Sequence, residues 1–250
     1  MNELLGLSYS PWSEKARWAL DVRHVPYRYR MFQPLIGEPA LRIKTRRWTG
    51  TVTVPVMTDD QGRVYADSAD IARFADAHGE GPTLFPKQHE SAITRWIDLG
   101  ERALEAGRVL SLHRTLADDE ALKELLPRGL RNALGGLAAR VGEMGVRRTL
   151  RKYGASTQSL EVHRSSAKAA LDELRVALAK STSTPKTVLG TFTFADIAAA
   201  QMLSFVSPPA FGLKLGKASR RGFTDPDLAK QYADLVTWRD ALYEAHRPRT

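Results

Sequence analysis

The chain of 250 residues contains no cysteine. Disulfide bonds, thiolate metal sites and a dithiol redox centre within the protein are therefore excluded. Its six histidines are scattered along the sequence, and no two have the His-x-x-x-His spacing that holds a metal ion on one helix face. We accordingly expect a protein that binds no metal.

Long hydrophobic runs are also absent. No stretch approaches the ~18 consecutive apolar residues of a membrane-spanning helix, and the first residues lack the basic segment and apolar core of a secretion signal. Hydrophobic residues make up 43% of the chain and charged residues 26%, which is typical of globular proteins, and the length suits one large domain or two smaller ones. We expect a soluble, cytoplasmic protein without a membrane span.

Acidic residues are too few to balance the basic ones, which leaves a net charge of +9. Residues 127–152, the basic segment, hold seven basic residues and one acidic residue, so two thirds of the excess lies there. Apolar residues at helical spacing predict an amphipathic helix, which the glycines of the segment should weaken or bend. They are Leu130, Leu134, Leu137, Val141 and Met144. The lack of interleaved aromatic residues disfavours a nucleic-acid surface; a solvated face, a field that attracts anionic ligands and a cover over a cleft remain.

A strand followed by a helix is predicted at the start of the chain. Residues 4–7 form an apolar run, and apolar residues at helical spacing follow it. Pro11 suits the first helical position, which makes Ser10 the N-cap. A hydroxyl group therefore lies at a helix N-terminus, where free N–H groups and the macrodipole favour an anion. Taken alone, Ser10 is more simply explained as an ordinary cap.

The rest of residues 1–81 predicts a mixed α/β region. Strict alternation at residues 27–31 predicts a half-buried strand, and a short helix fits the basic stretch that follows. Residues 51–57 predict a strand whose Pro55 should confine it to a sheet edge or a special turn. A turn and a returning strand fit residues 59–66, and a helix should begin at Asp67 and end near residue 79.

Only helices are predicted after a proline-punctuated linker. Their segments, besides the basic one, are 91–104, 120–126, 159–180, 193–205 and 226–246. Thr193 and Asp196 form a capping box. The helix that follows this box is apolar on all sides, so we expect it to be the buried centre of the second half.

This arrangement resembles the glutathione transferases. Four motifs carry the resemblance in the family's order: Ser-Pro-Trp-Ser at 10–13, Thr-Val-Pro-Val at 53–56, Asp-Ser with Asp-Ile at 67–71, and Thr-Phe-Ala-Asp at 193–196. The resemblance implies an α/β, thioredoxin-like N-terminal domain over residues 1–81, a linker at 82–89 and an all-α C-terminal domain over 90–250. It also implies glutathione as the co-substrate.

The resemblance makes the turn at residues 10–13 the candidate active site. The thiol of glutathione has a pKa near 8.5, and lowering it by ~2 units requires about 2.7 kcal/mol in favour of the thiolate. The Ser10 hydroxyl would donate a hydrogen bond to the thiolate, and the helix N-terminus would add to this stabilisation. Ser13 is the rival catalytic residue, because similar turns carry a reactive cysteine at that position. Tyr9 is a more distant candidate.

Further residues are implied to bind glutathione. Val54, before a cis Pro55, would pair its backbone with the cysteinyl unit, although most X–Pro bonds are trans. Asp67 suits the ammonium group of the glutamyl end, and Ser68 with the helix N–H groups suits its carboxylate, although both residues also fit ordinary caps. The glycyl carboxylate calls for a cation, and a basic cluster lies in the right region. Its members are Arg42, Lys44, Arg46 and Arg47.

The implied function is that of a glutathione transferase that activates the thiol for attack on a small electrophile. Two alternatives remain, a non-catalytic binding or scaffold protein with the same fold and a glutathione-dependent isomerase or dehalogenase. A thiol–disulfide reductase is disfavoured because both turn positions are serine. The acceptor pocket is expected between the first helix and the helical half, near Arg114 or Phe211. The family usually forms homodimers, so a homodimer is also expected.

Overall fold

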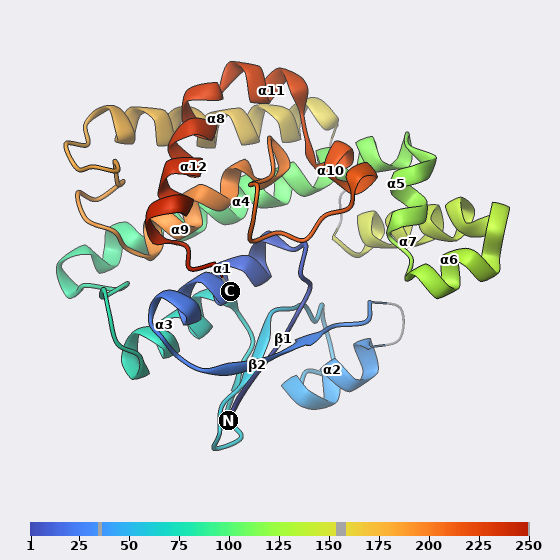
Figure 1. Ribbon diagram of the computed structural model, residues 1–250, viewed down its shortest axis with the longest axis horizontal. Coiled ribbons are helices and arrows are strands. Elements are labelled where there is room, and N and C mark those ends of the chain that lie inside the picture. The colour runs from blue at the N-terminus through green and yellow to red at the C-terminus, as the bar shows by residue number, and fades with distance from the viewer. Residues whose placement is uncertain (35–36, 154–158, 250) are drawn as a thin grey trace.

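A small sheet with three helices forms one side of the molecule, and a larger group of helices forms the other, as the computed structural model shows (Figure 1). The structure describes residues 1–34, 37–153 and 159–249. Helix α1 (Pro11–Val22) lies between the sheet and the larger group of helices. Within the described residues, the last strand ends at Tyr65, and every later element is helical.

Four strands form the sheet in the order β2-β1-β3-β4. Their bounds are β1 Asn2–Gly6, β2 Tyr27–Met31, β3 Val56–Thr58 and β4 Val64–Tyr65. Strand β1 pairs in parallel with β2 and antiparallel with β3, and β3 pairs antiparallel with β4. Two placements were predicted for the strand that contains Pro55, a sheet edge or a special turn. The edge placement is wrong, and the chain instead has a cis Val54–Pro55 bond just before the strand. Strand β3 lies inside the sheet and begins only after Pro55, so the proline removes no donor from the ladder.

Helices cover both faces of the sheet because neighbouring residues of a strand point in opposite directions. Leu4 belongs to the main core with residues of α1 and of α3 (Ser68–His78). Leu5 packs instead in a smaller cluster that contains Leu41 of α2 (Glu38–Thr45). Strand β1 is thus sandwiched between α1 and α3 on one face and α2 on the other.

The second half of the molecule is a stack of helices above α1 (Figure 1). Their bounds are α4 Glu90–Leu116, α5 Asp119–Glu124, α6 Arg128–Leu134, α7 Ala138–Lys152, α8 Leu160–Ala179, α9 Phe194–Gln201, α10 Lys217–Phe223, α11 Pro226–Gln231 and α12 Ala233–His246. Short 3-10 turns cover Lys87–His89, Gly135–Leu137 and Met202–Phe205. The helix predicted over 226–246 is therefore two helices that meet at Tyr232. No helix of the described ranges is long and apolar enough to cross a membrane.

Helix α9 is the buried centre of the helical half. All of its residues are buried, and the capping box of Thr193 and Asp196 is present at its start. The Asp196 carboxylate accepts hydrogen bonds from the backbone N–H groups of Val188, at 2.8 Å, and Thr193, at 2.9 Å. One buried carboxylate thus fixes both the helix start and the loop before it.

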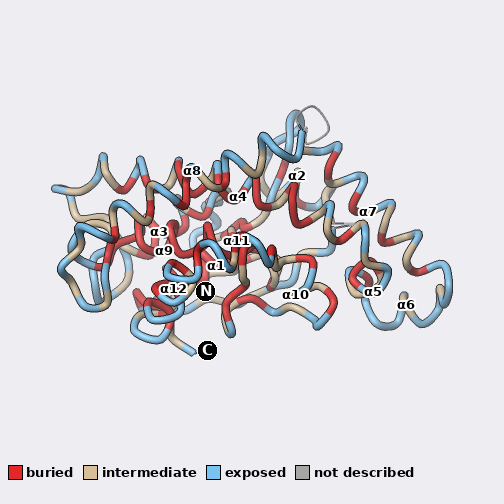
Figure 2. The backbone as a smooth tube through the Cα atoms, turned by 90° about the horizontal axis from the view of Figure 1, so that it is seen from above, coloured by how far each residue is buried: buried red, intermediate tan, exposed pale blue. Residues whose placement is uncertain are grey.

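The basic segment forms a bent pair of helices, but it buries a different face from the predicted one. The chain turns at Gly135, whose φ of 51° lies in the left-handed region. The buried face of α7 consists of Ala138, Gly142, Val146 and Leu150. Gly142 approaches the Leu122 carbonyl so closely that an added Cβ would lie 2.3 Å from its oxygen. In contrast, Leu137 and Met144 of the expected apolar stripe are 56% and 69% exposed. Much of α6 and α7 is exposed at one end of the molecule (Figure 2).

The capping box generates a prediction about pH. Burial raises the pKa of Asp196 to about 7, against the opposing effect of its hydrogen bonds. Because an unfolded aspartate titrates near ~3.9, the folded protein holds a proton between these values that the unfolded chain has lost. The contribution of Asp196 to the free energy of unfolding should therefore fall as pH rises from about 4 to about 7.

The variant Asp196→Asn does not titrate, so the parent should lose stability relative to this variant as pH rises through that range. Urea denaturation of both proteins across a pH series measures the difference. A stability difference that is the same at every pH would contradict the raised pKa.

Candidate functional site

The sheet register gathers the predicted site segments at one end of the sheet. The pairs Leu4 with Met57 and Leu5 with Val56 join β1 to β3. Extended along both strands, this register sets Pro55 beside the end of β1, just before the turn that leads into α1. Strand β4 runs to the same end, and α3 begins there with Asp67 as its N-cap. The helices α1 and α3 therefore start close to the segment that contains Val54.

Ser10 is the N-cap of α1, as its position before Pro11 predicts. Its Oγ accepts a long hydrogen bond, 3.5 Å, from the Ser13 N–H. No described residue accepts the proton of the Ser10 hydroxyl, which leaves this hydroxyl as a free donor at a helix N-terminus. The Ser10 residue is 9% exposed, so it lies at the surface edge of the core.

Ser13 occupies a closed environment. Its side chain is fully buried, and its Oγ accepts a hydrogen bond of 3.0 Å from the Leu7 N–H. A Cβ added to Gly6 would lie 2.8 Å from this oxygen, so the strand backbone leaves no space beside it. The Ser13 hydroxyl thus supports the turn between β1 and α1. Burial raises the pKa of Tyr9 to about 12, which keeps its hydroxyl protonated.

In the segment before β3, the backbone N–H and C=O groups of Val54 are available to a ligand. The Val54–Pro55 peptide bond is cis. Val54 is partly buried, and within the described residues neither its N–H nor its C=O takes part in a backbone hydrogen bond. A buried peptide group normally finds a partner, so Val54 presents both a donor and an acceptor to any extended ligand that reaches it.

The start of α3 presents a second set of polar groups. Asp67 is exposed, and its Oδ1 accepts a hydrogen bond of 2.6 Å from the Ala69 N–H, which confirms its capping role. Ser68 is 1% exposed, and its Oγ has no hydrogen-bond partner among the described residues. A buried hydroxyl without a partner costs about 1–3 kcal/mol. Ser68 is therefore a group for which a ligand could supply the missing bond.

The basic cluster after β2 divides into two pairs. Arg42 forms an ion pair with Glu38, and Lys44 forms one with Glu3. Arg46 and Arg47 are exposed and have no acidic partner within the described parts of the chain. Two of the four basic residues, Arg42 and Lys44, are thus paired with carboxylates. The other two, Arg46 and Arg47, are available to bind an anionic ligand.

A contact between distant segments was not predicted by the sequence. Glu101 of α4 accepts a hydrogen bond of 2.6 Å from Trp12 Nε1 and pairs with the buried Lys15. Both partners belong to the first turns of α1. Nothing in the local pattern signals this pairing, because the residues lie more than eighty positions apart. The start of α1 is thereby fixed to the helical half of the molecule.

The end of the basic segment also reaches the site. Lys152 of α7 donates a hydrogen bond of 2.9 Å to the carbonyl of Val52, two residues before Val54. The same ammonium lies 3.5 Å from Glu38 of α2. The end of the basic segment therefore contacts the chain close to Val54, and the expectation that the segment covers a cleft stays a prediction.

The expected acceptor residue Arg114 has a structural role. Its guanidinium donates to Asp225 at 3.0 Å and to the Phe205 carbonyl at 2.9 Å. These contacts fix α4 to the segments around α10 and leave Arg114 fully engaged. No cluster of three or more side chains that could hold a metal ion occurs in the part of the chain that the structure describes.

A thioredoxin-like sheet with a helical domain, and a hydroxyl at the start of its first helix, define a glutathione transferase fold. Residues 9–78 match the family model described as the glutathione S-transferase N-terminal domain. A probable glutathione S-transferase of Solanum tuberosum is 28% identical over 95 residues, which covers 38% of this chain and 42% of that protein. The match thus spans less than half of the length of this curated relative.

Solved structures agree with this fold over the whole chain. A glutathione S-transferase of Methylobacillus flagellatus with glutathione bound has a TM-score of 0.59 and 17% identity, with 100% of both chains covered. A glutathione S-transferase of Methylobacterium radiotolerans in complex with glutathione sulfonate has a TM-score of 0.60 and 17% identity, with 100% of this chain and 95% of that chain covered.

Residues 9–78 accordingly match the glutathione S-transferase N-terminal domain, the fold agrees with that of solved glutathione transferases, and the resemblance of the chain to this family is confirmed.

The contact between α1 and α4 generates a prediction about stability. Glu101→Gln keeps an acceptor for Trp12 but leaves the buried Lys15 without a counter-charge. Breaking a fully buried pair costs ~3–5 kcal/mol, and because Glu101 is 33% exposed we expect a loss of about 2–3 kcal/mol in the free energy of unfolding. Urea denaturation measures this loss.

The matched control is Glu105→Gln, because Glu105 is exposed on the same helix and has no ion pair among the described residues. It should change the free energy of unfolding by no more than about 0.5 kcal/mol. Adding Lys15→Met to Glu101→Gln should recover part of the loss. Equal effects of the two glutamine variants would show that the pairing with Lys15 contributes no stability.

Proposed function

We propose that this protein is a glutathione transferase in which Ser10 stabilises the thiolate of glutathione for attack on a small electrophile. The observation that carries the proposal is the free hydroxyl donor of Ser10 at the N-terminus of α1. Bound glutathione in solved structures of the same fold supports the choice of co-substrate. Glutathione is consumed in this reaction, and the proposal requires no metal.

The energetics of the turn are sufficient for this role. A hydrogen bond to a charged sulfur contributes ~1.5–3 kcal/mol, and a helix N-terminus adds up to ~2 kcal/mol in a partly buried geometry. Their sum covers the roughly 2.7 kcal/mol needed to lower the thiol pKa by ~2 units. Ser10 can cap the helix with its oxygen and donate its proton at the same time. The closed environment of Ser13 favours Ser10 as the donor.

The remaining polar groups suit the length of the tripeptide. The Val54 N–H and C=O would pair with the cysteinyl unit, beside Pro55. Asp67 would bind the glutamyl ammonium, and the Ser68 hydroxyl with the first N–H groups of α3 would bind the glutamyl carboxylate. Arg46 and Arg47 are the available cations for the glycyl carboxylate.

We assign a separate role to each of the two domains. We propose residues 1–81 as the glutathione-binding domain, residues 82–89 as the linker and residues 90–250 as the domain that supplies the electrophile site and a dimer contact. The electrophile would then enter between α1 and α4, where residues of both domains meet.

Two alanine variants test the role of each serine. Ser10→Ala should raise the pKa of bound glutathione by one to two units, equivalent to ~1.4–2.7 kcal/mol, and remove a cap worth about 1 kcal/mol. Ser13→Ala should leave that pKa unchanged but lower the free energy of unfolding by about 1–3 kcal/mol, because the buried Leu7 N–H loses its acceptor. Thiolate absorbance against pH and urea denaturation measure the two quantities.

The opposite pattern, with the titration moved by Ser13→Ala alone, would identify Ser13 as the catalytic donor. If the parent binds glutathione without ionising it, the protein is a binding or scaffold member of the family and not a transferase. Retention on immobilised glutathione provides the control that the variants still bind the tripeptide.

A further prediction concerns the oligomeric state of the protein. Closed twofold dimers are the commonest oligomers of soluble proteins, and we expect this chain to form a homodimer through its two domains. Light scattering should then give a mass of about 56 kDa, twice the 27.8 kDa of the chain. A mass near 27.8 kDa at micromolar concentration would contradict the dimer.

A further inference from the structure

Arg108 of α4 is held between two aromatic rings. Its guanidinium carbon lies 4.9 Å from the centre of the Trp12 ring and 3.7 Å from the centre of the Tyr153 ring. Trp12 belongs to the first turn of α1, two residues after Ser10, and Tyr153 follows α7. The cation therefore lies where α1, α4 and the end of the basic segment meet.

This cation has no anionic partner among the residues that the structure describes. Arg108 forms no ion pair or hydrogen bond with any described residue, and its Nε is buried without a partner. Burial lowers the pKa of Arg108, whereas Tyr153, Glu105 and Glu101 raise it less strongly. The oxygens of Glu101 are already occupied by Trp12 and Lys15.

Glu105 does not neutralise the cation either, because it is exposed one turn earlier on α4 and makes no ion pair with it. The aromatic faces hold the guanidinium without neutralising its charge. A partly buried cation is stabilised by a paired anion, and a ligand that carries one would supply the partner that the described residues do not.

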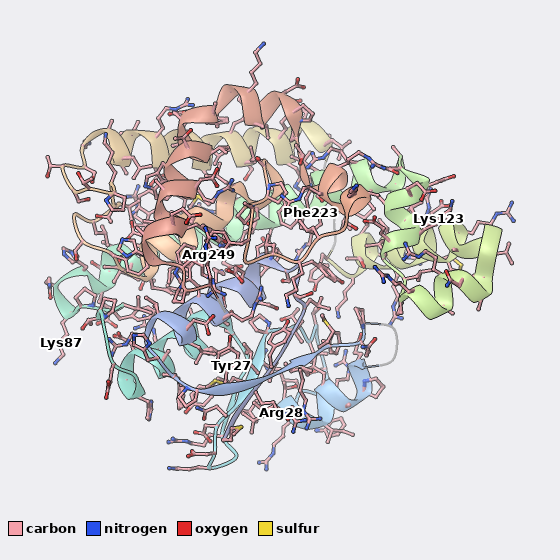
Figure 3. All side chains as sticks on the ribbon, in the orientation of Figure 1. Tyr27, Arg28, Lys87, Lys123, Phe223 and Arg249 are labelled. Atoms are coloured by element: carbon pink, nitrogen blue, oxygen red, sulfur yellow. The ribbon has the colours of Figure 1, made fainter. Side chains whose placement is uncertain are left out.

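The surroundings of Arg108 also suit an aromatic or apolar body. The centre of the Trp12 ring lies 6.3 Å from that of Phe205, which in turn lies 4.9 Å from that of Phe223. Phe223 is labelled in Figure 3 at the end of α10. Phe205 is buried, whereas Trp12 and Phe223 on either side of it are partly exposed. These two rings offer aromatic surface beside Arg108, and aromatic surfaces bind planar groups by stacking or edge contacts.

We propose that Arg108 binds the carboxylate of the second substrate, which makes this protein selective for electrophiles that carry an anionic carboxylate next to a planar body. A guanidinium presents paired N–H donors that match a carboxylate. This inference rests on the proposed transferase function for the reaction, but the binding of the carboxylate does not depend on glutathione.

The reaction expected with such a substrate is a substitution, and para-(chloromethyl)benzoate is a suitable probe. The glutathione thiolate attacks the benzylic carbon, a carbon–sulfur bond forms and the carbon–chlorine bond breaks. Chloride leaves with the bonding electron pair, and the proton lost from the thiol goes to solvent. Arg108 takes no part in bond making. It orients the substrate through the carboxylate at the opposite end of the ring.

Binding is tested first, with the unreactive pair para-toluate and para-toluamide. These two compounds share their shape and differ in charge. Titration calorimetry of the parent should show tighter binding of the toluate by about tenfold or more. Arg108→Met should remove this preference and leave the binding of toluamide unchanged. The control is Arg140→Met, which removes the same charge from an exposed arginine of α7 and should keep the preference.

A second variant and a salt series cover the case in which Arg108→Met fails to fold. Arg108→Lys keeps the charge but loses the planar donors, so its preference for toluate should be intermediate. In the parent, added salt should weaken the binding of toluate and not that of toluamide. Equal binding of the two compounds by the parent, or equal losses for both in Arg108→Lys, would overturn the proposal and assign Arg108 a purely structural role.

Measurements of kcat/KM distinguish a failure of the carboxylate site from a failure of the proposed transferase function. The ratio of kcat/KM for para-(chloromethyl)benzoate over its carboxamide should fall by about tenfold in Arg108→Met and stay constant in Arg140→Met. A protein that prefers toluate through Arg108 but does not ionise glutathione would support the carboxylate site and refute the transferase. A protein that conjugates both compounds with equal kcat/KM would support the transferase and refute the carboxylate site.

Discussion

The buried carboxylate of Glu14 joins the two halves of this molecule. It lies 2.5 Å from Arg17 within α1 and 2.7 Å from Arg247, which follows α12. Arg247 also donates to Asp21 at 2.7 Å. Although burial opposes its charged form, the carboxylates of Glu14 and Asp21 raise the pKa of Arg247. A buried charge is stable only when it is paired, and removal of one partner costs about 3–5 kcal/mol. The first helix and the last are therefore constrained to remain together.

This constraint explains how a helix with so many charged residues can lie between the sheet and the helical half. Helix α1 buries Glu14, Lys15 and Arg17, each paired with an opposite charge. On another side of α1, the centre of the Trp18 ring lies 4.4 Å from the centre of the Tyr243 ring. The Nε1–H of Trp18 also donates a hydrogen bond of 2.9 Å to the His246 carbonyl. A helix held from several directions presents its N-terminus in a fixed orientation. A fixed donor such as the Ser10 hydroxyl is what electrostatic stabilisation of a thiolate requires, because no reorganisation is then needed during the reaction.

The features predicted correctly from the sequence depend on neighbours in the chain. The cap at Ser10, the cap at Asp67 and the capping box at Asp196 each involve residues a few positions apart. The errors arise from tertiary contacts. The spacing of Leu137 and Met144 suggested the buried face of the basic segment, but the face that contains Gly142 and Val146 packs inward, where Gly142 approaches Leu122 closely. Likewise, the two serines of the turn are equivalent by composition, and only the hydrogen bond from the Leu7 N–H distinguishes the enclosed Ser13. The partners of Lys15 and Arg108 lie on distant elements that no local pattern identifies.

The end of α7 connects the two parts of the proposed site. Lys152 contacts the Val52 carbonyl, which precedes the backbone proposed to bind the cysteinyl unit, while the adjacent Tyr153 covers Arg108. Consecutive residues of one helix end thus contact the proposed glutathione segment and the proposed electrophile segment. The contact with Val52 needs the ammonium of Lys152, whereas the contact with Arg108 needs the aromatic face of Tyr153. Neither contact uses the exposed arginines of the basic segment, so the contacts at the proposed site come from Lys152 and from Tyr153, which follows the segment.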